Sequence, residues 1–320
     1  MPEITLESDA LRVVCTPAQG FSISSLVDRV SGAEALWRRE THAVEPCSRA
    51  LGPAGELSDM TFLDRFAGGW FEMFPEVGYT QPGDAASLVH GEVVRLPWEL
   101  TDQGPLHVSA QVALVRRPLT IERTLSVSGA TLTVHERIAN RGQVPVPYTW
   151  GHHPCFSRAT FAGGRIELDV AAAEVPDPWF DPANAVLAHG PFAWPQVSRR
   201  DGGTADLAAL PPERDGRADH ACLTLGDRGG SLRLTAPRAG ADGRALRVEF
   251  DVAQFPYALL WQNFGAGAGF PFWGEGDTFA VEFSTMPGRA TPDAIAAGAV
   301  SALAPGASSQ TTFTVAWEAL

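Results

Sequence analysis

The chain has few cysteines and no long run of apolar residues. Only four of its 320 residues are cysteines, and no two of them form a Cys-x-x-Cys pair. Scattered cysteines do not suit a disulfide framework or a zinc site, so we expect reduced thiols in a cytoplasmic protein. The start of the chain lacks the basic and apolar segments of a secretion signal, and no apolar stretch is long enough to span a bilayer.

Basic residues are also scarce. The sequence has 24 basic side chains, all arginines, against 37 aspartates and glutamates, which gives a formal net charge of -13. Nucleic acids and anionic membranes are bound largely through basic side chains, so we expect neither as a partner. The same balance weighs against heavily phosphorylated substrates, although a single local arginine can outweigh the global charge.

Short β-strands account for most of the chain. Apolar and polar residues alternate clearly at 106–115 and 119–127, and less strictly at 130–138. Alternation with a period of two, broken by Arg-Pro or Ser-Gly, is typical of antiparallel strands in a meander. Further strands are predicted at 165–170, 221–225, 231–235, 244–250, 257–262, 278–284 and 311–316.

Helical patterns are few. Residues 291–298 combine a threonine that can cap a helix, a proline at the first helical position and several alanines, and residues 58–66 predict a further helical turn. Residues 191–217 are rich in proline, glycine and charge, so we expect a long surface loop there.

The order of these elements decides the fold class. The chain has no βαβ repeats, which excludes a doubly wound α/β fold. Its length suggests two domains, but all-β sandwiches often exceed 200 residues as one unit. We therefore predict an all-β fold, a large antiparallel β-sandwich with few short helices, that forms a single domain over residues 1–320.

Two adjacent histidines, His152 and His153, lie among bulky apolar residues, and Pro154 prevents this run from continuing as a helix. Neighbouring side chains in a strand point to opposite faces, so the two imidazoles cannot easily share one task or one metal. One of them can line a pocket while the other supports it from behind. Histidine exchanges protons near neutral pH, so an acid–base role is open to the one in the pocket.

Glu282 lies inside the apolar strand predicted at 278–284. An ionised carboxylate is costly in such surroundings. The position suits either an outward-facing residue on an edge strand or a base in a cavity. Taken singly, His90 and Asp219 suit turn or cap residues, and Trp261 suits the core.

Four short motifs follow one another along the chain in an order that resembles a known family. They are His90-Gly91, His153-Pro154-Cys155-Phe156, Asp219-His220, and Val281-Glu282-Phe283-Ser284-Thr285-Met286-Pro287-Gly288. In this order they resemble the aldose 1-epimerases, also called galactose mutarotases, and Leu303-Ala304-Pro305-Gly306 resembles that family's closing turn before a last strand. Cys155 stands where the family usually has a tyrosine.

The resemblance implies a galactose mutarotase-like sandwich and an enzyme that interconverts the α and β anomers of an aldose by acid/base ring opening and closure. Glu282 would be the base at the C1 hydroxyl, His153 the acid at the ring oxygen, and His90 a second donor near that oxygen. Asp219 would bind sugar hydroxyls, and Trp261 would cover the apolar face of the sugar. No metal or organic cofactor is implied. The expected partner is a small aldohexose-like sugar, bound by a monomer or a homodimer.

Three further residues are candidates for substrate binding. Arg65 stands near the place of the family's sugar-contacting arginine, upstream of the first histidine, and Glu72 lies in a segment, 68–75, that does not resemble the best-known members. His152 is a candidate in place of His153. Because segment 68–75 departs from the family pattern, three alternatives on the same fold stay open. They are a non-catalytic carbohydrate-binding or sensing protein, a sugar-phosphate epimerase and a glycosidase. A glycosidase would need a second carboxylate, such as Asp219, across the sugar from Glu282.

Overall fold

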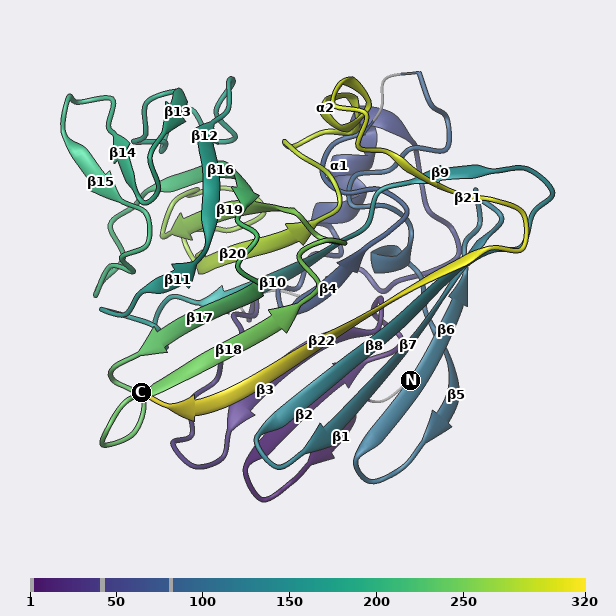
Figure 1. The fold of residues 1–320 in the computed structure, drawn as a ribbon, viewed down its shortest axis with the longest axis horizontal. Helices are drawn as coiled ribbons and strands as arrows, with labels where there is room; N and C mark the ends of the chain where they lie inside the picture. The colour runs from purple at the N-terminus through teal and green to yellow at the C-terminus, as the bar shows by residue number, and fades with distance from the viewer. Residues whose placement is uncertain (1–2, 41–43, 81–82) are drawn as a thin grey trace.

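The computed structural model describes residues 3–40, 44–80 and 83–320, and its two large sheets pack face to face (Figure 1). The eight-stranded sheet lies in front in this view, and the two α-helices lie together at one end of the molecule. Every strand pair within the sheets is antiparallel. The predicted antiparallel β-sandwich is confirmed.

The ten-stranded sheet has the order β1 (Ile4–Glu7), β2 (Leu11–Thr16), β3 (Ser22–Asp28), β4 (Trp70–Met73), β10 (Gly151–Ser157), β20 (Asp277–Ser284), β19 (Tyr257–Phe264), β16 (Ala218–Leu225), β12 (Val170–Val175) and β13 (Gly190–Phe192). The eight-stranded sheet has the order β11 (Ile166–Leu168), β17 (Gly230–Ala236), β18 (Arg244–Phe250), β22 (Ser308–Ala319), β8 (Thr131–Asn140), β7 (Leu119–Ser128), β6 (His107–Ala113) and β5 (Glu99–Gln103).

The shorter elements lie in the connections between these strands. Two small ribbons pair β14 (Gln196–Ser198) with β15 (Thr204–Asp206) and β21 (Ser301–Leu303) with β9 (Val146–Tyr148). The helices of the described residues are α1 (Ser58–Leu63), α2 (Thr291–Ala296) and the 3₁₀ turns Gly55–Leu57 and Val93–Arg95. None of these helices is long and apolar enough to cross a membrane.

Alternation along the strands explains which sheet face is buried. In β7 every second side chain is buried, because one face meets the sandwich core and the other meets solvent. In β10 and β20 almost every side chain is buried. A second apolar cluster, which includes Phe62, Phe66 and Phe272, covers the outer face of the ten-stranded sheet. This double cover accounts for the nearly continuous apolar run around Glu282.

Two local expectations differ from the structure. Residues 191–217 hold parts of three short strands, β13, β14 and β15, because the Pro-Gly-rich turns between them are short enough to let the chain pair with itself. Helix α2 begins at Thr291 with Ala290 in the cap position, not Thr291. The Asp293 carboxylate accepts hydrogen bonds from the backbone N–H groups of Arg289 and Ala290, at 3.1 Å each, and so supplies the cap from inside the helix.

Candidate active site

A cavity lies on the outer face of the ten-stranded sheet, where β10, β20, β19 and β16 are neighbours. The strand register sets His153 opposite Phe71 of β4, and Glu282 opposite Leu259 of β19. Side chains in register point to the same face of a sheet. The cavity is lined by Asp59, Phe62, Leu63, Phe66, Gly78, Tyr79, Val89, His90, His153, Phe180, His220, Leu259, Trp261, Phe272, Glu282 and Arg289.

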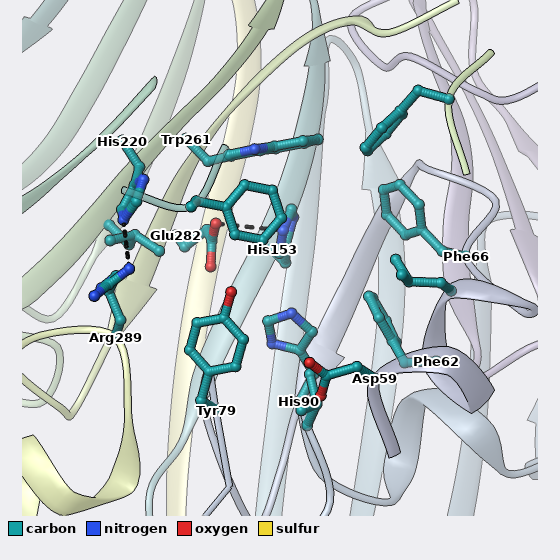
Figure 2. A pocket seen from close by; sticks show the side chains of 16 residues that line it. Asp59, Phe62, Phe66, Tyr79, His90, His153, His220, Trp261, Glu282 and Arg289 are labelled. Atoms are coloured by element: carbon teal, nitrogen blue, oxygen red, sulfur yellow. Dashed lines mark hydrogen bonds and ion pairs between the residues drawn. The ribbon is translucent and has the colours of Figure 1, made fainter. Parts of the chain in front are cut away.

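His153 and Glu282 form a pair at the centre of this cavity (Figure 2). The His153 Nε2 lies 3.3 Å from the Glu282 Oε1, and both side chains are buried, with 5% and 3% of their residues' surface exposed. Burial lowers the pKa of His153 to about 3 and raises the pKa of Glu282 well above its usual range. Desolvation thus favours the neutral form of each group, so the two side chains are a neutral potential proton donor and acceptor in direct contact.

The His153 ring is held on two sides. It stacks on Phe71 with ring centroids 4.5 Å apart, and its Nδ1 lies 3.4 Å from the Cys155 Sγ. Burial raises the pKa of the Cys155 thiol well above its usual range, so the sulfur carries a proton. These contacts fix the ring plane with Nε2 toward Glu282.

His90 reaches the same cavity from a turn. Its φ of 57° is unusual for a residue other than glycine, and the following Gly91 has a φ of 74° and lies against the Phe74 carbonyl, which an added Cβ would meet at 2.3 Å. The His90 and His153 ring centroids are 5.6 Å apart. Burial, together with the neighbouring His153, lowers the pKa of His90 well below its usual range. The turn therefore brings a second neutral imidazole beside the central pair.

Trp261 lines the cavity from β19, with its ring centroid 5.8 Å from that of His153. Together with Phe66 and Phe272 it makes an aromatic wall, and the centroids of Trp261 and these two rings are 6.5 and 5.8 Å apart. Flat aromatic faces pack well against the C–H faces of a sugar ring. Phe66 follows helix α1, and Phe272 comes from the loop before β20.

Asp219 does not face the cavity, which corrects its expected contact with sugar hydroxyls. Its Oδ1 accepts hydrogen bonds from the backbone N–H groups of Val186 and Leu187, at 3.0 and 3.1 Å. The next residue on β16, His220, points into the cavity, and strand alternation sends Asp219 to the opposite face. In the Asp-His motif it is therefore the histidine that lines the site.

Arg65 also lies outside this cavity. Its guanidinium Nη1 donates a hydrogen bond to the Thr61 carbonyl oxygen at 2.8 Å. The Arg65 residue lines a different pocket, together with Gln19 and Val94. The chain turns after α1, so that Phe66 enters the cavity while Arg65 points away from it. The expected sugar contact of Arg65 is corrected accordingly.

Glu72 and His152 lie on the inner face of the ten-stranded sheet, inside the sandwich, so neither lines the cavity. The His152 Nε2 lies 3.2 Å from Glu136 of β8, and its Nδ1 lies 3.6 Å from Glu72 of β4. The Arg123 Nε of β7 lies 2.8 Å from the Glu136 Oε1, and the Trp150 indole N–H donates to Glu72. Alternation along β10 thus separates His152 from His153, as the sequence predicted.

This inner cluster has one strong charge pair. Burial and the Glu136 charge raise the pKa of Glu72 well above its usual range. Burial acts to raise the pKa of Glu136, but His152 and Arg123 lower it to about 2.

Ligand atoms of Glu72, Glu136 and His152 lie within 4.8 Å of one another and so could hold a metal ion. Arg123 already supplies the positive charge at this place, which makes a buried ion pair the simpler description.

Several cavity residues have no counterpart in the sequence prediction. Tyr79, Arg289, Phe62, Phe66 and Phe272 come from loops and from helix α1. Arg289 directly follows Pro287-Gly288, the end of the motif that contains Glu282, so its place in the sequence is a signal that could have identified it. Nothing in the local sequence places the others, because they reach the cavity through contacts between distant segments.

The comparisons with known proteins support the fold. No protein-family model matches this sequence, and no curated protein matches it significantly. Among solved structures, a galactose mutarotase-like protein from Lactobacillus casei is 18% identical, with 99% of this chain and 100% of that chain covered and a TM-score of 0.62. A galactose mutarotase-like protein from Clostridium acetobutylicum is 12% identical, with 99% and 95% covered and a TM-score of 0.69.

A third structure carries a more specific name. A candidate aldose 1-epimerase from Escherichia coli K12 is 17% identical, with 100% of this chain and 99% of that chain covered and a TM-score of 0.67. At these identities the likeness is one of fold. This chain therefore has the galactose mutarotase-like β-sandwich fold, as the resemblance implied.

Proposed function

We propose that this protein is a carbohydrate-active isomerase that interconverts the α and β anomers of an aldose. The observation that carries the proposal is the His153–Glu282 pair, 3.3 Å apart and buried beneath an aromatic wall. An acid and a base in contact, inside a cavity of mutarotase-like fold, suit a reaction that only moves protons. The fold alone would not support this activity, since one fold hosts many reactions.

The reaction needs a proton removed from the C1 hydroxyl and a proton delivered to the ring oxygen. Both oxygens are bonded to the same carbon, so an acid and a base on adjacent strands can reach both. Glu282 takes the hydroxyl proton while the His153 Nε2–H protonates the ring oxygen; the C1–O5 bond breaks, and the aldehyde forms. Rotation about C1–C2 and closure with the proton transfers reversed give the other anomer. Each proton transfer contributes about 10²–10⁴ in rate.

Three neighbours support these two groups. His90 offers a second imidazole near the ring oxygen. Trp261 covers the apolar face of the sugar and excludes water, which strengthens electrostatic effects inside the cavity. With the protonated Cys155 thiol as the donor in its 3.4 Å contact with the His153 Nδ1, the Nε2 of the neutral ring carries the proton to be donated.

Polarimetry tests the proposal. Pure α anomers of common hexoses and pentoses, mixed with the protein, should mutarotate faster than in buffer. Glu282→Gln should remove this excess rate and keep the fold, as judged by circular dichroism. Glu249→Gln, an exposed change of the same kind on β18, is the matched control and should keep the rate. Full activity of Glu282→Gln would show that Glu282 is not the base.

A glycosidase is a second candidate, because Asp59 is a further carboxyl group lining the same cavity. Asp219, which the sequence offered for this role, is held by backbone N–H groups outside it. Release of reducing ends from an oligosaccharide, lost in Asp59→Asn, would favour this reaction over anomer exchange. Sugar binding in a calorimeter without any faster mutarotation would favour a binding protein.

A further inference from the structure

Arg289 lines the cavity, and its positive charge has no carboxylate partner among the described side chains. Arg289 follows the turn after β20, and its guanidinium Nη1 lies 3.2 Å from the His220 Nε2. Among the side chains that the structure describes, no carboxylate oxygen lies within 4.0 Å of this guanidinium. The chain contains no lysine, so its cationic side chains are arginines and protonated histidines.

The backbone at Arg289 is firmly placed. Its carbonyl oxygen accepts a hydrogen bond from the Tyr79 N–H at 2.8 Å, and its own N–H donates to Asp293 at 3.1 Å. Gly78 lies so close that an added Cβ would meet the Arg289 carbonyl oxygen at 2.0 Å. The Asp293 carboxylate thus binds backbone groups and leaves the guanidinium unneutralised.

His220 orients the guanidinium without neutralising it. Arginine has only donors, so the His220 Nε2 must accept the hydrogen bond. Burial, and then the charge of Arg289 itself, lowers the pKa of His220 to about 3, which keeps this imidazole neutral. The Glu282 carboxyl faces His153, and Figure 2 shows Asp59 on the other side of the cavity, beside His90. The remaining guanidinium donors therefore have room for a ligand.

Tyr79 adds a neutral donor beside this charge. Its hydroxyl points into the cavity between Arg289 and the central pair (Figure 2). Burial raises the pKa of Tyr79 to about 12, so the phenol keeps its proton. A planar guanidinium fork with a phenol next to it is the arrangement that binds an oxyanion, and a single fork matches a carboxylate particularly well.

We propose that Arg289, oriented by His220 and assisted by Tyr79, binds an oxyanion on the sugar, so that the substrate is an anionic aldose. The inference rests on the proposed function and names its substrate class. A hexuronate would supply a carboxylate, and a hexose phosphate would supply a phosphate. The local charge of Arg289 acts at contact distance, where it outweighs the diffuse net charge of -13.

Two measurements test this proposal. The first compares kcat/KM for mutarotation of D-glucuronate, D-glucose 6-phosphate and D-glucose. The wild-type protein should prefer one of the anionic sugars over glucose at least tenfold, and the preferred sugar distinguishes carboxylate from phosphate. Arg289→Gln should lose at least tenfold of that preference. Arg238→Gln, which removes an exposed arginine elsewhere, has the same effect on net charge and should keep the preference.

The second measurement is binding of the same three sugars by calorimetry, in the Glu282→Gln background. Binding of an anionic sugar that depends on Arg289, without mutarotation by the wild-type protein, would support this inference and reject the isomerase. Mutarotation with no anionic preference, or a preference that survives in Arg289→Gln, would reject the inference and leave the isomerase. Arg289→Lys keeps the charge without the fork, and it replaces Arg289→Gln if that variant fails to fold. Absence of any anionic binding also overturns the inference.

Discussion

Burial sets the protonation of the groups at the centre of the cavity. His153 keeps 5% of its surface exposed and Glu282 keeps 3%, and among the described side chains each has the other as its ion-pair partner. Desolvation then disfavours both charged forms. A base must be ionised to act, so the raised pKa of Glu282 decides the pH at which the proposed reaction runs.

The rate of mutarotation should therefore rise along a single limb as pH increases. The midpoint should lie well above 4.5, the ordinary pKa of a glutamate, because burial raises the Glu282 pKa. His153, with a pKa near 3, is neutral on both sides of pH 6.5 and adds no limb there. Measurement of kcat/KM between pH 4 and 9 checks this, since it reports the free protein. A second inflection, in addition to the one that Glu282 produces, would contradict the neutral imidazole of His153.

The same burial makes stability depend on pH through Glu282. Above pH 4.5 the unfolded chain ionises this residue while the folded chain keeps it protonated. Rising pH then lowers the free energy of unfolding relative to Glu282→Gln, by about 1.4 kcal/mol per pH unit, until the pH passes the raised pKa. Urea unfolding of both proteins at several pH values measures the difference. A difference that stays constant from pH 4 to 8 would mean that the carboxyl is solvated.

At the scale of elements, β10 serves two environments at once. Its outer face presents His153 to the cavity, and its inner face presents His152 to the buried cluster of Glu72, Glu136 and Arg123. The sequence predicted this division, because alternation is a local property of any strand. It did not predict that Asp219 points away while His220 points in, since a two-residue motif does not fix the phase of its strand.

The buried cluster should be essential for packing the two sheets. Arg123 and Glu136 belong to the eight-stranded sheet, and Glu72 and His152 to the ten-stranded sheet. Arg123→Met leaves the Glu136 charge without its arginine in the core, and we expect a loss of about 3–5 kcal/mol in the free energy of unfolding. Adding Glu136→Leu should restore much of it, because an apolar pair needs no compensating charge. Urea denaturation at pH 7 measures both, and a cost below about 1 kcal/mol for Arg123→Met would contradict the role.

At the scale of the whole molecule, sequence patterns predict strands better than they predict neighbours. The strand predicted at 244–250 matches β18 (Arg244–Phe250), and the strand predicted at 278–284 lies within β20 (Asp277–Ser284). The order that sets β10 between β4 and β20 joins segments far apart in the chain. Such pairings follow from packing, so the cavity and its loop residues, Arg289 among them, could not be predicted from any one segment. The expected monomer or homodimer stays a prediction.

The single domain expected over residues 1–320 also stays a prediction, and unfolding can test it. One apolar core receives side chains from both sheets, including Trp70 of β4 and Phe313 of β22, whose ring centroids are 6.4 Å apart. Separating the sheets would expose this core, so we expect them to unfold together in one cooperative transition. Tryptophan fluorescence and far-ultraviolet circular dichroism should give the same midpoint in urea, and the calorimetric and van't Hoff enthalpies should agree. Two separated transitions would instead divide the chain into independently folding parts, and the cavity, which draws on β10, β20, β19 and β16, would then belong to the part that unfolds with Glu282.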